Sequence, residues 1–279
     1  MEASDIMKKR LIIAGVSLVA LIGAAVLLMP RKAPVPVVVE PYEKGDDSAG
    51  LLYAKAGKCE KNGDLLSAKK IYKDLLREFP ESGMVKDVRK SLDSVNIKIL
   101  FSPVETQDSL FYEVKPGDNL SAIAKGHGTT VELIMKSNNL ADTVIKPGEK
   151  LKISTAKYSV LVDKSQNILM LKSDEEVIKT YTVSTGMNNA TPAGTYRIVN
   201  KLTDPTWYRA GAIVPSGSPE NILGSRWMGL DLEGYGIHGT SDESTIGTHI
   251  TKGCVRMRNK DVEELYSILP VGVEVSIID

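Results

Sequence analysis

Four hydrophobic patterns follow one another along the 279 residues of the chain. Residues 11–29 are an unbroken run of apolar and small side chains. Between about 47 and 97, apolar positions recur at spacings of three, four and seven, which predicts helices. A mixed strand-and-helix pattern follows, and from Tyr158 onward apolar and polar residues alternate, which predicts short strands. We therefore expect a multi-domain protein divided as 1–10, 11–29, 30–46, 47–97, 110–155 and 157–279.

The apolar run at 11–29 is long enough to cross a membrane. At about 1.5 Å per residue it spans roughly 28 Å, close to the hydrocarbon thickness of a bilayer. The basic cluster before it, Lys8 to Arg10, is denser than the one after it, which predicts a cytoplasmic tail at 1–10 and an exported remainder. A cleaved signal peptide is the alternative, although no small-x-small site lies between the run and Pro30. Residues 30–46 are expected to form an extended, proline-punctuated linker.

A helical hairpin is predicted within residues 47–97. Gly63 and Asp64 interrupt the helical pattern, and Pro80 ends the second helix. The segment LYAKAGKCEKNGDLLSAKKIYKDLLREFP resembles one tetratricopeptide repeat, with a further helix from about Ser82 to Val95. One helix pair buries its own face poorly, so a spacer and a binding site for a protein partner both remain open. Cys59 lies at an inward position, where it suits a small buried hydrophobe.

The segment 110–155 has the order strand, turn, two short helices and strand. Its text YEVKPGDNLSAIA, GTTVELIMKSNNL and IKPGEKLKI resembles a LysM module, a small βααβ fold. The resemblance implies binding to N-acetylglucosamine-containing glycans, and hence to peptidoglycan. Asp118 also suits a cap on the following helix, which is the role we favour for it, and His127 is given no chemical role. The residues expected along the glycan groove are Gly117, Asp118, Asn119, Asn138, Leu140 and Ile145.

The last segment, 157–279, is predicted to be a β-rich sandwich or barrel. Short runs of alternating residues are separated by turn residues at 163–167 and 173–176. The expected strands are 158–162, 168–171, 177–183 and 195–199, followed much later by a helix at 259–268 and a strand at 273–278.

Candidate chemistry is concentrated near the end of this segment. Of three His and two Cys in the chain, His238, His249 and Cys254 lie close together in the sequence. An imidazole can take the proton of a thiol, so we expect a thiolate–imidazolium ion pair between a nucleophile and its base. His249 is the rival to His238 as the base, and we interpret it as a polar loop residue.

The residues around Cys254 suit the same chemistry. Gly253 lets a carbonyl group approach the backbone closely, and the N–H groups of Gly253 and Cys254 suit an oxyanion hole. Lys252 and Arg256 add positive charge, which is expected to lower the pKa of the thiol.

Composition excludes several other functions. The chain carries 35 Lys+Arg and 35 Asp+Glu, and with no long basic run we do not expect nucleic acid as a partner. Two His and one Cys lack a fourth ligand at a familiar spacing, so neither a metal nor another cofactor is expected. A hydrophobic content of 42% is enough for real cores. A disulfide between Cys59 and Cys254 is not expected, because it would block the nucleophile.

The text IHGT…IG…TKGCVRM resembles the signature of the YkuD-type L,D-transpeptidases, and TPAGTYRIVNKLTDPTWY, ENILGSRWMGLD and the C-terminal tail fit the same domain. The resemblance implies Cys254 as nucleophile and His238 as base, with the Gly239 carbonyl holding the second ring nitrogen. Thr251, Lys252 and Gly253 would assist the oxyanion or the substrate; many members have His at the position of Lys252. Arg256 either anchors a substrate carboxylate or braces the loop through a salt bridge, and we favour the brace.

The same resemblance implies the reaction. A stem tetrapeptide of peptidoglycan would acylate the cysteine with release of D-Ala, and an amine would take the acyl group, giving a 3→3 cross-link or an attached protein. A hydrolase that trims stem peptides and a non-catalytic wall-binding scaffold are the alternatives. Trp207, Tyr208 and Trp227 either wall the groove or only pack. The expected location is the cell membrane, with the catalytic domain on the periplasmic or wall side, or secretion if the N-terminal segment is cleaved.

Overall fold

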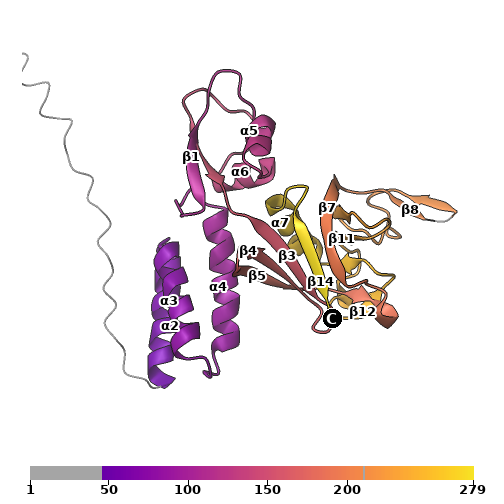
Figure 1. Ribbon diagram of the computed structural model, residues 1–279. Helices are drawn as coiled ribbons and strands as arrows, with labels where there is room; N and C mark the ends of the chain where they lie inside the picture. Colours follow the sequence, from indigo (N-terminus) through magenta and orange to yellow (C-terminus); the bar gives the residue numbers. More distant parts are fainter. Residues whose placement is uncertain (1–45, 210) are drawn as a thin grey trace, which may run out of the picture. The chain divides into compact units, whose positions relative to one another are not determined.

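The computed structural model describes residues 46–279 except Ala210 (Figure 1). The expected tail, membrane anchor and most of the linker therefore lie outside the described residues. Within the described part, no helix is both long and apolar enough to span a bilayer.

Three helices form the first part: α2 (Asp46–Lys61), α3 (Leu65–Glu78) and α4 (Val85–Leu100). Gly63 turns the chain between α2 and α3 with φ of +79°, and the Asp64 side chain caps α3 by accepting from the Ser67 N–H at 3.2 Å. The predicted apolar stripe forms the core, which includes Leu52, Ala56, Ala68, Tyr72 and Leu75. The hairpin prediction is confirmed as helices, while the likeness to a tetratricopeptide repeat stays a prediction.

Helix α4 differs from the predicted helix at Ser82 to Val95. It starts later and runs five residues further, because Ile97 and Ile99 continue its apolar face. Ile99 belongs to the helical core, whereas Ile97 belongs to the core of the C-terminal domain. The Asn96 amide also donates to the Ile178 carbonyl at 2.9 Å. The end of α4 is therefore shared between two cores.

The next part has the predicted βααβ order: β1 (Ser109–Glu113), α5 (Leu120–Gly126), α6 (Val131–Ser137) and β2 (Lys150–Ser154). The two strands pair antiparallel, with Phe111 opposite Lys152. Asn119, not Asp118, caps α5 by accepting from the Ala122 N–H at 2.9 Å. The favoured capping role of Asp118 is thus wrong: its carboxylate accepts from Tyr112 Oη and Lys115 N instead, both at 2.8 Å.

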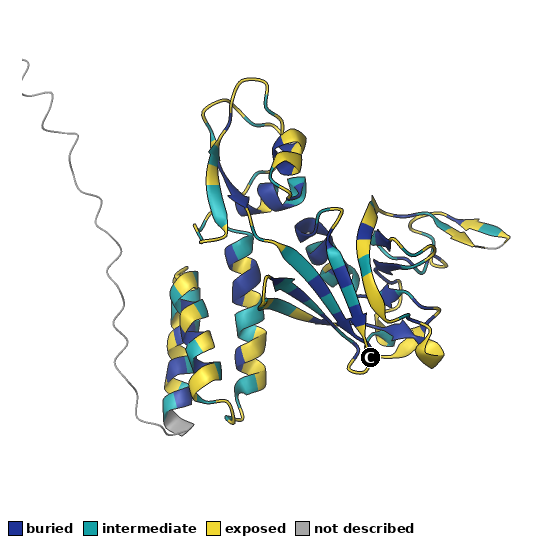
Figure 2. Ribbon diagram, viewed as in Figure 1, coloured by how far each residue is buried: buried dark blue, intermediate teal, exposed yellow. Residues whose placement is uncertain are grey.

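The C-terminal domain is built on an eight-stranded mixed sheet in the order β13-β11-β10-β7-β14-β3-β4-β5. The last strand of the chain, β14, lies between β3, to which it is parallel, and β7, to which it is antiparallel. Alternate residues of β4 and β14 are buried, as Figure 2 shows in dark blue. The strands are β3 (Tyr158–Asp163), β4 (Ile168–Ser173), β5 (Glu176–Thr182), β7 (Gly194–Thr203), β10 (Arg226–Leu230), β11 (Gly236–His238), β13 (Val255–Arg256) and β14 (Glu274–Ile278).

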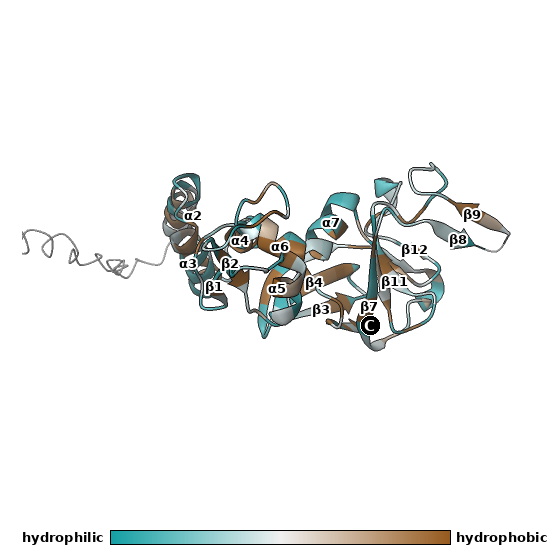
Figure 3. Ribbon diagram, turned by 90° about the horizontal axis from the view of Figure 1, so that it is seen from above, coloured by the Kyte–Doolittle hydropathy of each residue, from teal (hydrophilic) through white to brown (hydrophobic). Residues whose placement is uncertain are grey.

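Shorter elements complete the domain. Helix α7 (Asn259–Ile268), at its predicted position, packs on the sheet with Val262 and Leu265 fully buried. Two small sheets pair β6 (Thr185–Gly186) with β12 (His249–Thr251) and β8 (Trp207–Arg209) with β9 (Ala212–Val214). The β8–β9 hairpin carries apolar side chains into solvent; β9 is brown in Figure 3 and Ile213 is 70% exposed. The 3₁₀ turns are η1 (Met187–Asn189) and η2 (Glu243–Thr245).

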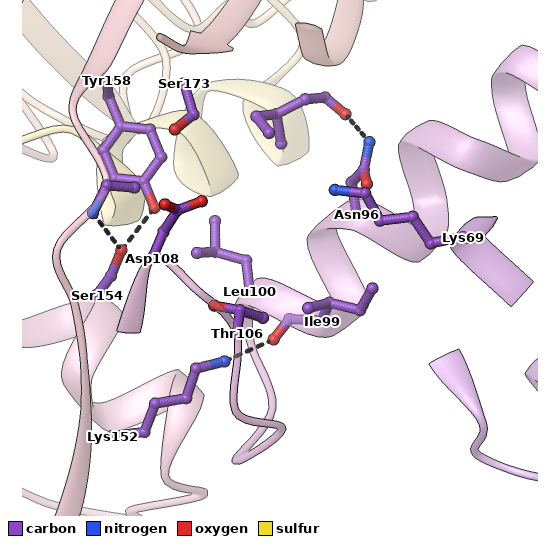
Figure 4. A pocket seen from close by; sticks show the side chains of 12 residues that line it. Lys69, Asn96, Ile99, Leu100, Thr106, Asp108, Lys152, Ser154, Tyr158 and Ser173 are labelled. Atoms are coloured by element: carbon purple, nitrogen blue, oxygen red, sulfur yellow. Dashed lines mark hydrogen bonds between the residues drawn. The ribbon is translucent and has the colours of Figure 1, made fainter. Parts of the chain in front are cut away.

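A small cavity of about 90 Å³ lies where α4, β2 and the start of the C-terminal domain meet (Figure 4). Lys152, 2% exposed, donates there to the carbonyls of Ile99 and Ser102 at 2.9 and 2.8 Å. It thereby binds carbonyls at the negative end of α4. Burial lowers the pKa of Lys152 to about 8. The cavity has room for about three waters, which is too small for a sugar or peptide, so we treat it as a packing junction.

Candidate active site

The loop that carries Cys254 is closed by the side chain of Thr251. Thr251 Oγ1 donates to the Cys254 carbonyl at 2.7 Å and accepts from the Gly253 N–H at 3.1 Å. Gly253 has φ of +131°, and a Cβ on it would lie 2.5 Å from the Tyr235 ring. Only glycine fits both demands. Thr251 and the Gly253 N–H are therefore committed to the shape of the loop.

Pairing between β11 and β13 brings the predicted nucleophile and base to one face. The strands are parallel, with Ile237 beside Val255 and His238 beside Arg256. Ile237 and Val255 are buried in the core. Because side chains alternate along a strand, His238, Arg256 and Cys254 face the other way. All three line a single pocket of about 550 Å³.

The His238 ring is held in one tautomer. Its Nδ1 lies 2.6 Å from the Gly239 carbonyl oxygen. A carbonyl only accepts, so we assign the proton to Nδ1, which leaves Nε2 as the basic nitrogen. The indole of Trp227 stacks on the imidazole with ring centroids 6.0 Å apart, and Asn200 Oδ1 accepts from the indole N–H at 3.1 Å. His238 is 2% exposed, so its ring is shielded from solvent, fixed at Nδ1 by the Gly239 carbonyl and on one face by the Trp227 indole.

Burial shifts the pKa values of both His238 and Cys254. Desolvation lowers the pKa of His238 to about 4, a shift only partly offset by backbone hydrogen bonds to Gly239 and Leu223. Desolvation likewise raises the pKa of the Cys254 thiol above its ordinary value, and the nearby Arg256 charge offsets this only in part. Both shifts disfavour the expected thiolate–imidazolium pair. The sulfur of Cys254 lies 3.6 Å from the Gly234 carbonyl oxygen, in the same pocket as the imidazole of His238.

Arg256 braces the site, though without a salt bridge. Its Nη1 donates to Thr245 Oγ1 at 3.2 Å, and its backbone pairs with Ser184. Among the described residues no salt bridge joins it to a carboxylate, although the charge of Asp242 acts on its guanidinium, and its buried Nε lacks a hydrogen-bond partner. Lys252 is exposed and also lines the pocket. The predicted brace is therefore a hydroxyl contact.

The pocket is apolar on most sides and positive where it is charged. The three aromatic residues Trp207, Tyr208 and Trp227 all line it, and Tyr208 is 73% exposed on the β8–β9 hairpin. The lining includes Lys252 and Arg256 but, among the described residues, no Asp or Glu. Such a surface suits an extended ligand that carries carboxylates.

His249 lies outside this pocket. It is exposed on β12, where Nδ1 lies 2.7 Å from Thr185 Oγ1 and Nε2 lies 3.2 Å from the Asn167 amide nitrogen. Thr185 Oγ1 in turn donates to Asn167 Oδ1 at 2.9 Å. Both ring nitrogens are therefore engaged by neighbouring side chains.

The residues expected along the glycan groove divide into two sets. The amide of Asn138 is used internally, since it donates to the carbonyls of Ile134 and Lys152 and accepts from the Lys152 N–H. Leu140 and Ile145 pack on the core of the βααβ module while remaining partly exposed. Gly117 and Asn119 are exposed in the turn before α5. Asn138 therefore builds the module instead of facing a ligand.

Several residues at the site were not singled out from the sequence. Gly234 and Tyr235 surround the thiol loop, Asn200 holds Trp227, and Asn259 binds the backbone beside Gly239. They lie far from Cys254 in sequence or carry ordinary side chains. No group of His, Cys, Asp and Glu within the described residues is arranged to hold a metal ion, and both cysteines are free thiols.

Comparison with known proteins identifies the class to which this fold and site belong. Residues 157–277 match the YkuD family, the L,D-transpeptidase catalytic domain, and residues 112–154 match the LysM domain. The chain is 34% identical over 177 residues to the candidate L,D-transpeptidase YkuD of Bacillus licheniformis, covering 60% of this chain and 98% of that protein. The chain belongs to the YkuD-type L,D-transpeptidase family, whose members are cysteine-dependent acyltransferases.

Other proteins are similar to parts of the chain. The candidate L,D-transpeptidase YqjB of Bacillus subtilis is 40% identical over 126 residues, which are 43% of this chain and 70% of YqjB. Among solved structures, an L,D-transpeptidase from Mycobacterium smegmatis matches with a TM-score of 0.39 and 18% identity, over 47% of this chain and 64% of that one. The chain thus spans less than two thirds of that structure.

Proposed function

We propose that this protein cross-links peptidoglycan, with Cys254 as nucleophile and His238 as general base. The carrying observation is the shared face of β11 and β13, where the thiol and a base of fixed tautomer line one pocket. The Gly239 carbonyl takes the place of the carboxylate of a catalytic triad. Because both groups start neutral, the proton leaves sulfur as the attack occurs, and no thiolate is stored beforehand.

In the first step, the sulfur of Cys254 attacks the carbonyl of the third, diamino acid residue of a stem tetrapeptide. Nε2 of His238 takes the thiol proton and delivers it to the departing amine of D-Ala, which leaves a thioester. An acceptor amine then attacks the thioester, loses a proton to His238 and forms an amide, and the proton returns to sulfur. With an amine of a second stem the product is a 3→3 cross-link, and with water it is a trimmed stem.

For the oxyanion we propose the Cys254 N–H as the first donor. The Gly253 N–H, the other donor expected from the sequence, is bound to Thr251 Oγ1. It contributes only if the loop shifts when substrate binds. In this proposal the Thr251 side chain holds the shape of the loop. The backbone N–H of Cys254 stabilises the oxyanion.

The positive charge of the pocket supports binding of an anionic stem peptide as the acyl donor. Lys252 and Arg256, which both line the pocket, are cationic groups for carboxylates of the stem peptide. In this proposal Arg256 serves both as brace, through Thr245, and as anchor.

The LysM module is proposed to bind glycan through the exposed part of the expected groove, Gly117, Asn119, Leu140 and Ile145, with Asp118 shaping the turn. Glycan binding would raise the local concentration of the attached stem peptides. Residues 11–29 are proposed as the anchor that places both domains on the wall side of the membrane, and the helical segment as a spacer or partner site.

Two measurements test the proposal. Intact-mass analysis after exposure to a carbapenem should show one adduct on the wild type and on Cys59→Ala, and none on Cys254→Ala. Defined tetrapeptide muropeptides should yield 3→3 dimers and free D-Ala. An adduct on Cys254→Ala, or no adduct on the wild type, contradicts the nucleophile and favours the scaffold. Trimmed stems without dimers would make the protein a hydrolase.

A further inference from the structure

Asn259, the first residue of α7, binds the backbone that orients His238. Its Oδ1 accepts from the N–H groups of Thr240 and Ser225, each at 3.1 Å, and its Nδ2 donates to the Thr240 carbonyl at 2.8 Å. The Thr240 nitrogen and the Gly239 carbonyl belong to the same peptide group. One side of this peptide therefore contacts Asn259 and the other contacts the imidazole.

The Asn259 amide is packed tightly against the backbone of Gly224 and Gly239. A Cβ added to Gly239 would lie 2.1 Å from Asn259 Oδ1, and one added to Gly224 would lie 2.2 Å from it. Such distances exclude a side chain at either glycine while the amide stays in place. The backbone at Gly224 and Gly239 therefore packs directly against Asn259 Oδ1. A small movement of the Asn259 amide must then move the Gly239–Thr240 peptide.

This arrangement has a direct consequence for the base. A peptide whose N–H donates to a hydrogen bond becomes a better acceptor at its carbonyl, because the two hydrogen bonds polarise the same group. We propose that Asn259 is a positioning residue, which fixes the Gly239–Thr240 peptide so that its carbonyl holds His238 in the Nδ1–H tautomer. This inference rests on the proposed role of His238 as base.

Saturation kinetics of carbapenem acylation test it. Asn259→Ala should lower the limiting rate of adduct formation about 100-fold, the scale of a misplaced catalytic group, and change the half-saturating concentration less than twofold. Nitrogen NMR of the His238 ring should show a protonated Nδ1 in the wild type and a mixture of tautomers in the variant. Asn96→Ala is the matched control, since it removes another buried amide and should retain the wild-type rate and tautomer.

Asn259→Asp separates positioning from folding. It keeps the acceptor for the Thr240 N–H, so its rate should return to within about tenfold of the wild type. Its negative charge should move the acidic limb of the pH–rate profile upward by about one unit. The other titratable or charged groups lining the pocket with His238 are Lys252, Cys254 and Arg256, and all are unchanged.

The outcomes separate the two proposals. A wild-type limiting rate and an unchanged tautomer in Asn259→Ala overturn the inference while the Cys254 and His238 assignments stand. Retention of the rate in His238→Ala overturns the assigned base. If Asn259→Ala does not fold, Asn259→Asp decides: a raised acidic limb supports positioning, and a wild-type profile overturns it.

Discussion

The two histidines near the nucleophile have opposite surroundings. His238 is buried on β11, next to the edge strand β13, with one ring nitrogen fixed by a carbonyl and an indole stacked on its face. His249 is exposed on a short strand, with both ring nitrogens engaged by Thr185 and Asn167. His249 is closer to Cys254 in sequence, yet only His238 shares the pocket with the thiol.

The difference shows that strand pairing, and not sequence distance, decides which histidine shares the pocket with Cys254. The parallel β11–β13 pair aligns His238 with Arg256 and so with the face of Cys254. The β12–β6 pair takes His249 to another part of the domain. The imidazole of His238 is buried except where it lines the pocket. Its proton must therefore come from a group inside that pocket.

The largest expected effect is on acylation. His238→Ala should slow carbapenem adduct formation by about 10³-fold or more, in the range for loss of a general base, whereas His249→Ala should remain within twofold of the wild type. Intact-mass kinetics measure both rates. The reverse result, with loss in His249→Ala alone, would mean that the base has been misassigned.

The next effect is on stability. The pKa of His238 is about 4 in the folded protein and 6.5 ordinarily. Between these values only the unfolded chain takes up the proton, so the free energy of unfolding should fall by about 3 kcal/mol as the pH drops from 6.5 to 4. Denaturant unfolding of His238→Gln should lack this component, and His249→Gln should keep it. A pH dependence that is identical in all three proteins would contradict the buried neutral imidazole.

The third effect concerns the thiol. Because burial raises the pKa of Cys254, alkylation by iodoacetamide in a Cys59→Ala background should rise about tenfold per pH unit between pH 6 and 8, following the thiolate fraction. His249→Ala should give the same slope. A rate that is flat over this interval would indicate the ion pair that the sequence suggested.

The smallest effect is expected around His249. Thr185→Val removes the hydroxyl that joins His249 to Asn167 and should lower the free energy of unfolding by about 1–2 kcal/mol. The acylation rate should stay within threefold of the wild type. A large loss of acylation would show that the β6–β12 pair shapes the nucleophile loop more than its contacts suggest.

Regular periodicity made much of the fold predictable. The strands at β3, β4 and β5, the helix at α7 and the final strand were expected close to their observed bounds, whereas β7 runs four residues beyond the predicted end at 199. The short strands β6 and β8 to β13 were not, because two to five residues are too few to show alternation. The end of α4 was also missed, since its last turn packs against a domain that begins much later in the chain.

The site was predictable in its chemistry but not in its supports. Cys254 and His238 follow from residue type and motif, and Gly253 from its place before the nucleophile. The internal use of Asn138 and Thr251 depends on contacts that only the folded backbone creates. The same is true of Asn259, whose partners Gly239, Thr240 and Ser225 precede it by many residues. The direction of the thiol pKa could not be read from the sequence either, because burial outweighs the nearby positive charge of Arg256.

The partial burial of Cys254 also bears on how long the protein stays active. Peroxide attacks the ionised form of a thiol and converts it to sulfenic acid, from which further oxidation is irreversible. A sulfur that stays protonated until a substrate arrives offers little to such oxidants. The burial that makes the nucleophile slow to ionise should therefore extend its working life wherever peroxides are abundant.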